Sequence, residues 1–173
     1  MDHTALFADA ASRPVEAARH VLDGLSPDAL HTLPDGRGNS IAWLVWHAAR
    51  QQDVQVAALR GGPEVWESGG WAGRVGVDRG AGDFGFGDGV DQVQALRIAD
   101  ADALLAYLAA VADDLTAYTA SITAAELDDV VDTAWTPHVT RGVRLVSVID
   151  DAVAHLGQAA YVRGLVEGWS VGY

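Results

Sequence analysis

The sequence predicts an all-α protein that forms a single four-helix bundle domain over residues 1–173. Four segments of roughly 20 residues or more carry apolar side chains at helical spacing. Turn-rich or glycine-rich connectors separate them, and no segment alternates apolar and polar residues for long enough to predict a strand. A chain of this length can bury one sizeable core, so helices packed around a shared core are the expected architecture.

The first two helices have clear end signals. The first is predicted over residues 2–25, where a glycine and a Ser-Pro pair within 24–27 stop it. Residues 33–39 form a turn-rich connector, and the polar residues that end it are suitable N-caps for a second helix over 41–59. The Gly-Gly-Pro sequence at 61–63 ends that helix.

Residues 61–90 form the longest irregular stretch of the chain. It is rich in glycine and also holds several large aromatic side chains: Trp66, Trp71, Phe84 and Phe86. Because aromatic residues need somewhere to bury, full disorder is not expected. Two interpretations remain open: the segment folds over the end of the bundle, or it forms a lid over a substrate site.

The second half of the chain supplies the other two helices. The third is predicted over 100–121, with leucine and valine residues along one face. A Thr-x-x-Glu capping box at 123–126 begins a short turn, and 132–140 is predicted to be a connector. The last helix, over 141–167, is apolar on nearly every side, which predicts a position in the middle of the structure.

Composition excludes several classes of function. The chain has 24 acidic residues against 11 basic ones and a net charge of −13, which disfavours nucleic-acid partners. Every basic residue is arginine, a bias typical of bacterial genomes rich in GC. Cysteine is absent, which excludes disulfides and a thiol nucleophile from the protein itself. No apolar run predicts a membrane span and no signal sequence is evident, so a cytoplasmic protein without membrane contact is expected.

Three polar residues lie on helix faces that are otherwise apolar. Asp151 and His155 are four residues apart, which places one above the other on the last helix. His47 lies on an apolar segment of the second helix. Two imidazoles and one carboxylate form a half-open coordination shell for a divalent metal, so this trio is the predicted metal site. Spacing alone also allows a hydrogen-bonded core histidine and an ordinary Asp–His helix pair.

These residues carry a resemblance to a known family. The segments Ser40-Ile-Ala-Trp-Leu-Val-Trp-His47-Ala and Ile149-Asp-Asp-Ala-Val-Ala-His155-Leu-Gly-Gln158-Ala-Ala-Tyr-Val-Arg-Gly are similar to motifs of the DinB-like superfamily. That superfamily includes the metal-binding domain of mycothiol-dependent maleylpyruvate isomerase and the bacillithiol S-transferases. The resemblance implies an up-down-down-up four-helix bundle with a long crossover between the second and third helices, where residues 61–99 lie.

The resemblance also implies a site and a chemistry. His47, Asp151 and His155 become the ligands of a divalent metal, with Zn, Ni, Fe and Mn as candidates. The position of Asp151 is usually His or Glu in relatives, so the shorter aspartate is a departure from the family pattern. An enzyme of this type would activate mycothiol or another small thiol for S-transfer to an electrophile or for isomerisation. The alternative is a noncatalytic metal- or ligand-binding stress-response module.

Other polar and aromatic residues have predicted roles around this site. Gln51 and Gln158 are expected to orient a ligand, and Arg50 is a weaker candidate for binding a substrate carboxylate. Helical spacing otherwise predicts a solvent-facing side for a group of three charged residues: Arg50, Asp53 and Arg60. Three aromatic residues are interpreted mainly as packing: Trp43, Trp46 and Tyr161. Apolar helix faces leave room for a homodimer.

Overall fold

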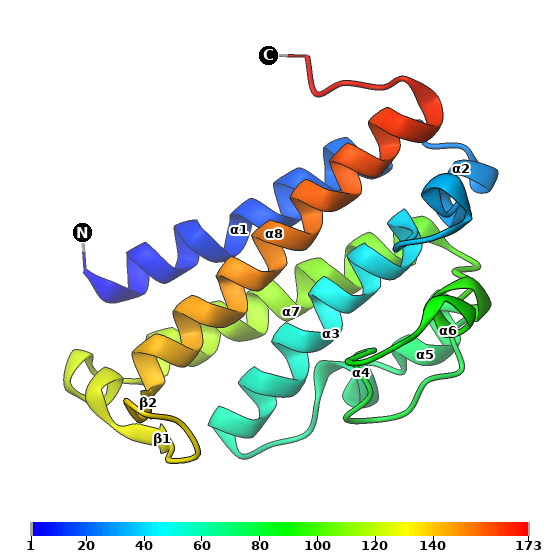
Figure 1. The fold of residues 1–173 in the computed structure, drawn as a ribbon. Helices are drawn as coiled ribbons and strands as arrows, with labels where there is room; N and C mark the ends of the chain where they lie inside the picture. Colours follow the sequence, from blue (N-terminus) through cyan, green and yellow to red (C-terminus); the bar gives the residue numbers. More distant parts are fainter. Residues whose placement is uncertain (1, 173) are drawn as a thin grey trace.

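The computed structural model describes residues 2–172. Its framework is four long helices that lie side by side (Figure 1): α1 (His3–Leu22), α3 (Ile41–Arg60), α7 (Ala101–Ser121) and α8 (Arg141–Glu167). Helix α3 packs against α7 and α8, and α1 packs against the same two helices. The predicted helical class is therefore confirmed, and the up-down-down-up order of helix directions stays a prediction.

The predicted helix boundaries match the structure to within three residues. Each long helix is preceded by an N-cap residue whose side chain accepts a hydrogen bond from a backbone N–H of the first turn: Asp2, Ser40, Asp100 and Thr140. Such caps satisfy backbone N–H groups that have no partner inside the helix. Helices α3 and α8 end at Gly61 and Gly168, which adopt the left-handed conformation (φ 73° and 67°) that glycine tolerates best.

The connectors contain short elements, of which the sequence predicted only η2, the turn that follows the capping box at residues 123–126. They are α2 (Pro27–His31), η1 (Pro34–Gly36), α4 (Val65–Ser68), α5 (Trp71–Val75), α6 (Val90–Ala95), η2 (Ala124–Asp128), β1 (Val130–Asp132) and β2 (Val139–Thr140). The two strands pair antiparallel in a small hairpin before α8. None of these elements exceeds six residues, which is too short for a periodic apolar pattern to emerge.

The core lies between the four long helices. Helix α3 is its most deeply buried part, with side chains such as Trp46 and Leu44 almost completely shielded from solvent. The crossover between α3 and α7 contributes Trp66 and Trp71 to the same core. Within residues 2–172 no helix combines the length and the hydropathy that crossing a bilayer requires.

The prediction that the last helix occupies the middle of the structure is wrong. In a bundle of four helices each helix has a face turned outward, and on α8 that face is apolar. It carries five large exposed side chains, which we call the outer stripe of α8: Val143, Val146, Val153, Tyr161 and Leu165. Tyr161 is 70% exposed, so its predicted role in packing is also wrong for this chain.

Candidate metal centre

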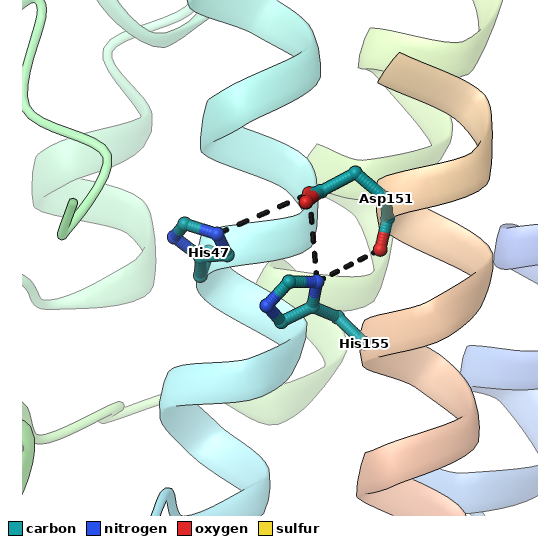
Figure 2. Close-up of side chains that lie close together, drawn as sticks. All are labelled: His47, Asp151 and His155. Carbon is teal, nitrogen blue, oxygen red and sulfur yellow. Dashed lines mark hydrogen bonds and ion pairs between the residues drawn. The ribbon is translucent and has the colours of Figure 1, made fainter. Parts of the chain in front are cut away.

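Two neighbouring helices bring the three predicted ligands together (Figure 2). His47 comes from the middle of α3, and Asp151 and His155 lie one turn apart on α8, the helix that packs most closely on α3. One nitrogen or oxygen atom from each of the three lies within 4.8 Å of the others. The imidazole centroids are 4.5 Å apart. The cluster therefore forms where two apolar helix faces meet.

His47 is held in place by the crossover and by its own helix. Its Nδ1 is hydrogen-bonded to the backbone carbonyl of Phe84, and its ring stacks on Trp43 with centroids 4.5 Å apart and planes at 8°. A carbonyl oxygen can only accept, so Nδ1 carries the proton. Nε2 is then left with a free lone pair facing Asp151, and fixing the tautomer in this way is typical of metal-binding histidines.

His155 is oriented by its own helix. Its Nδ1 is 2.8 Å from the backbone carbonyl of Asp151, one turn earlier. By the same reasoning Nδ1 is the donor, and Nε2 of His155 keeps a free lone pair. Both imidazoles therefore have an Nε2 atom available as a ligand.

One oxygen atom of the Asp151 carboxylate is buried without a hydrogen bond from the described residues. Within residues 2–172, its Oδ2 atom is buried and has no hydrogen-bond partner. The atom lies 3.4 Å from Nδ1 of His155 and 3.9 Å from Nε2 of His47. Burying a carboxylate oxygen without a donor or a cation is costly. A divalent ion between this oxygen and the imidazoles would remove that cost, so these residues fit a metal.

The charge state of His47 also suits a ligand. Burial lowers the pKa of His47, and the hydrogen bond from its ring to Phe84 offsets only part of that effect. A lowered pKa keeps the imidazole neutral, which is the form that binds metals.

Comparison with known proteins identifies the family. The DinB superfamily profile matches residues 12–159. The chain belongs to the DinB superfamily. A crystal structure described as the conserved protein of a locus from Enterococcus faecalis superposes with a TM-score of 0.89 at 36% sequence identity, covering 98% of this chain and 99% of that one. Among curated proteins no match is found.

A glycine-rich loop completes this DinB site, and the sequence did not predict its role. The loop carries Phe84, whose carbonyl holds His47, and Gly85, which has a positive φ of 78°. A Cβ on Gly85 would lie 2.9 Å from the ring of Trp46 and 3.1 Å from that of Trp43. Glycine at this position therefore lets the loop approach α3 closely enough for the Phe84 carbonyl to contact His47. The Gly-Asp-Phe-Gly-Phe-Gly sequence was the available signal.

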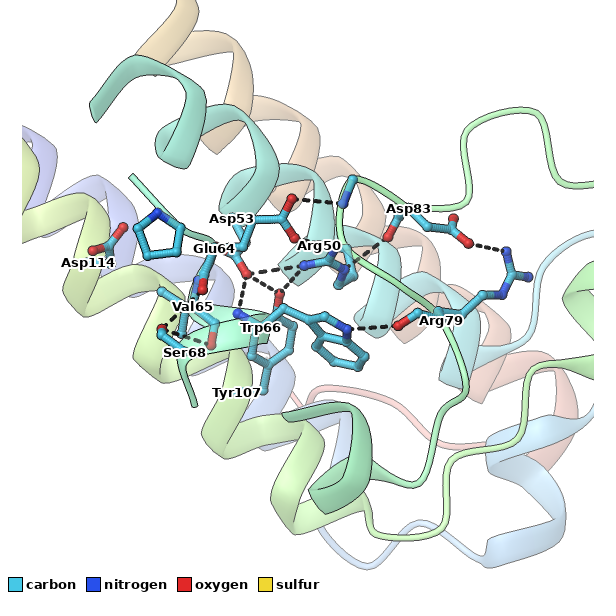
Figure 3. Close-up of polar contacts among 12 residues, drawn as sticks. Arg50, Asp53, Glu64, Val65, Trp66, Ser68, Arg79, Asp83, Tyr107 and Asp114 are labelled. Carbon is cyan, nitrogen blue, oxygen red and sulfur yellow. Dashed lines mark hydrogen bonds and ion pairs between the residues drawn. The ribbon is translucent and has the colours of Figure 1, made fainter. Parts of the chain in front are cut away.

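A buried charge cluster anchors that loop, and it corrects one prediction (Figure 3). Arg50 and Asp53 are fully buried, so the prediction of a solvent-facing side for them is wrong. The Arg50 guanidinium contacts Asp53 at 3.2 Å and Glu64 at 2.7 Å, and its Nε donates to the backbone carbonyl of Asp83. Asp53 in turn accepts hydrogen bonds from Tyr107 on α7 and from backbone N–H groups of α4. The cluster ties the crossover to α3 and α7.

The predicted substrate-binding residues lie in different surroundings. The amide of Gln51 is buried and donates to the Val148 carbonyl at 2.8 Å, which links α3 to α8 beside the candidate metal ligands. Gln158 is exposed one turn beyond His155. Arg50 belongs to the buried charge cluster. Substrate binding by these three residues stays a prediction, as does a lid role for the crossover.

In metal-free protein we expect the pKa of His47 to lie below its ordinary value of 6.5, chiefly because burial disfavours the imidazolium. The unfolded chain then binds the proton more readily than the folded chain. Stability linked to His47 is therefore fully present above pH 6.5 and is lost as the pH falls through the folded pKa. An NMR titration of the imidazole after chelation measures this, with the chain unfolded in urea as reference. A folded pKa equal to or above the reference would contradict it.

Proposed function

We propose that this DinB protein, as an up-down-down-up bundle, is a divalent-metal-dependent enzyme that activates a small thiol. The observation that carries the proposal is the buried Oδ2 of Asp151. Among the described residues 2–172 this atom has no hydrogen-bond partner, and it lies 3.4 Å from Nδ1 of His155 and 3.9 Å from Nε2 of His47. Nε2 of His47, Nε2 of His155 and Oδ2 of Asp151 would be the ligands. Zn, Ni, Fe and Mn all accept such a set, and the remaining positions would stay open for a substrate.

The shorter side chain of Asp151 is compatible with this role. Its Oδ2 already lies within 3.9 Å of Nε2 of His47, so a glutamate is not needed to bring a carboxylate between the helices. One ligand atom from each of the three residues lies within 4.8 Å of the others, so these residues would hold an ion with an aspartate at this position. The aspartate therefore supports binding and does not argue against it.

The surroundings determine where a substrate approaches. The His47 side chain is only 9% exposed, whereas that of Asp151 is 40% exposed, so the open side of the site lies over α8. The opposite side is closed by Trp43, which stacks on His47, and by Phe84. These walls are apolar and aromatic, which favours an electrophile with an apolar part.

The chain's own residues would bind and orient, and the sulfur would come from a second molecule. Since the protein has no cysteine, the nucleophile must be a small thiol such as mycothiol. When bound, a divalent ion lowers the pKa of a thiol at an open position and so supplies a thiolate at neutral pH. The Phe84 carbonyl would keep Nε2 of His47 directed at the site throughout. A cytoplasmic setting suits a reduced thiol.

We expect metal-loaded protein to conjugate monochlorobimane only when a small thiol is supplied. Cysteine and mycothiol are suitable thiols, and the fluorescent adduct gives the rate. The rate should rise with pH through the pKa of the thiol, because the thiolate is the reactive form. Chelation should remove the activity and added metal should restore it. Asp151→Ala should lower the rate about a hundredfold or more, because the open coordination shell loses one of three ligands.

The alternative is a noncatalytic binding module of the same fold. It is favoured by the departure from the usual His or Glu at position 151. If the protein binds metal tightly yet no thiol and electrophile from a broad panel react above the rate without protein, the binding module is the better description. Conjugation that survives chelation would instead require a mechanism without the ion.

A further inference from the structure

Phe86 presents an aromatic ring to solvent beside the candidate metal centre. Among residues 2–172 it is the most exposed of the large apolar side chains, at 87%. Its ring centroid lies 5.9 Å from that of Phe84, and the Phe84 ring lies 6.0 Å from the imidazole of His47. A row of three rings therefore leads from a candidate metal ligand to the surface.

The loop that carries this exposed ring is held from both of its ends. Single exposed apolar residues are common on protein surfaces, so exposure alone needs no explanation. Here, however, Arg79 donates to the carboxylates of Asp83 and Asp88 at 3.0 Å each, and Figure 3 shows the contact with Asp83. Asp88 also accepts a hydrogen bond from Nε1 of Trp43 on α3 at 3.0 Å. These contacts fix residues 83–88 on α3, so the position of the ring is defined.

Phe86 itself lies in a closed β-turn. The N–H of Asp88 donates to the carbonyl of Gly85 at 3.1 Å, which makes Phe86 the second residue of the turn and Gly87 the third. Gly87 has a φ of 83°, the left-handed value that glycine supplies at the third residue of a type II turn. A Cβ on Gly87 would meet no atom within 4 Å, so the backbone conformation and not the space calls for glycine there. The turn therefore holds the Phe86 ring in water.

We propose that Phe84 and Phe86 bind the ring of an uncharged aromatic electrophile, which makes aryl compounds the substrate class of this site. The inference rests on the proposed function, in which a thiolate at the metal is the nucleophile. Aromatic rings pair in offset or tilted arrangements with centroids about 4.5–7 Å apart. The Phe84–Phe86 and Phe84–His47 pairs lie in that range, and a substrate ring would extend the row. Because Phe84 is close to both Phe86 and His47, a ring held on both phenylalanines has one edge toward the candidate ligands.

The charges around the loop favour an uncharged ring. Two arginines contact the loop, Arg50 and Arg79, and each is already paired with two carboxylates at 2.7–3.2 Å. A substrate carboxylate would have to displace one of those partners. The net charge of −13 also repels anions at longer range. Neither effect opposes a neutral ring.

A chloroarene shows how the atoms balance in the transfer step. The thiol gives its proton to solvent as the thiolate forms. Sulfur then bonds to the ring carbon that carries chlorine, the carbon–chlorine bond breaks, and chloride leaves with its electron pair. The step needs no oxidant and no reductant. Nitro groups on the ring accept the negative charge that arrives with sulfur, so chlorodinitrobenzene is a suitable probe.

Steady-state kinetics with cysteine as the thiol and zinc as the metal tests the role of Phe86. Phe86→Ala should raise KM for chlorodinitrobenzene about tenfold and change kcat little, because the lost contact holds the ring equally in the ground state and the transition state. The rate with iodoacetamide, which has no ring, should change about twofold or less. Phe86→Tyr keeps an aromatic ring and should keep KM within about twofold of the wild-type value.

Trp135→Ala is the matched control for Phe86→Ala. It removes another exposed aromatic ring, which is 65% exposed and lies between β1 and β2, outside the crossover. This substitution should leave the kinetics with both electrophiles unchanged. An unchanged KM for chlorodinitrobenzene in Phe86→Ala, or an equal loss of rate with iodoacetamide, would overturn the aryl site.

An NMR titration separates the aryl site from catalysis. The probe is dinitrothioanisole, a thioether of the kind that the reaction forms, added to protein supplied with zinc. It should shift the backbone amide signals of residues 82–88, and Phe86→Ala should raise its dissociation constant about tenfold. If the titration gives this result while no electrophile reacts, the thiol chemistry fails and the aryl site stands. Shifts confined to other residues, or equal affinity in Phe86→Ala, would refute the aryl site even in an active enzyme.

Discussion

Replacing Arg50 by leucine should lower the free energy of unfolding by about 3–5 kcal/mol, one of the largest effects that a single substitution in this chain can have. The substitution leaves Asp53 and Glu64 with buried carboxylates and no guanidinium. It also removes the donor to the Asp83 carbonyl. Urea unfolding followed by circular dichroism measures the change. We also expect faster proteolysis within residues 61–90, because this cluster anchors that segment to α3.

A surface ion pair provides the comparison. Arg13 and Asp9 form a salt bridge at 2.6 Å on α1, and their side chains are 67% and 53% exposed. Arg13→Leu should therefore cost about 0.5 kcal/mol or less, because water screens exposed pairs. If Arg50→Leu cost no more than this substitution, the buried cluster would not be the anchor that its geometry indicates.

His155→Ala should abolish metal binding while leaving the helices folded. The remaining pair, His47 and Asp151, would form an incomplete shell, and affinity for zinc should fall about a thousandfold or more. Folding should persist because apolar burial along the helices supplies most of the free energy of folding. A bound ion adds only the stabilisation set by its concentration and its dissociation constant. Calorimetry with zinc and elemental analysis of protein purified without chelator measure the first effect, and circular dichroism measures the second.

Asp150→Ala is the matched control for the metal site. Asp150 precedes Asp151 but points about 100° away around the helix, and it is exposed. Its loss should leave zinc affinity unchanged, whereas Asp151→Ala should weaken it strongly. Comparable loss in both variants would show that general negative charge, and not a defined ligand set, attracts the ion. Unfolding of the chelated wild-type protein would instead make the metal structural.

The long helices could be predicted because two kinds of signal agree along this sequence: the helical spacing of apolar residues, and the residues that begin and end helices. Caps such as Ser40 and the glycines that end α3 and α8 mark boundaries independently of the apolar pattern. The placement of the last helix was not predictable in the same way. Its apolar residues on all sides suggest a central position, and only the arrangement of the other three helices shows that one of its faces is left uncovered.

The three side chains of the candidate site could be predicted from the sequence, but the contacts that hold them in place could not. The four-residue spacing of Asp151 and His155 places both on one helix face, so their proximity follows from helix geometry. The contact between His47 and Phe84 joins residues 37 positions apart. It uses the backbone carbonyl of Phe84, so no pattern of side chains in the sequence predicts it. Arg50 was assigned to solvent because helical spacing places it on a different face of the helix from His47. Its partner Glu64 comes from the crossover, whose fold the sequence does not predict, so nothing in the pattern shows that this face is covered.

The Phe84 carbonyl has a consequence for how this fold can diversify. A main-chain oxygen orients the imidazole of His47, a candidate metal ligand, whatever side chain stands at position 84. Neighbouring side chains of the loop can therefore change in size and polarity, and so alter which molecules are accepted, without disturbing the ligand itself. Gly85 is the exception, because any side chain there meets Trp43 and Trp46. We expect substrate preference and metal affinity to vary independently in laboratory evolution of this loop, provided that the glycine is kept.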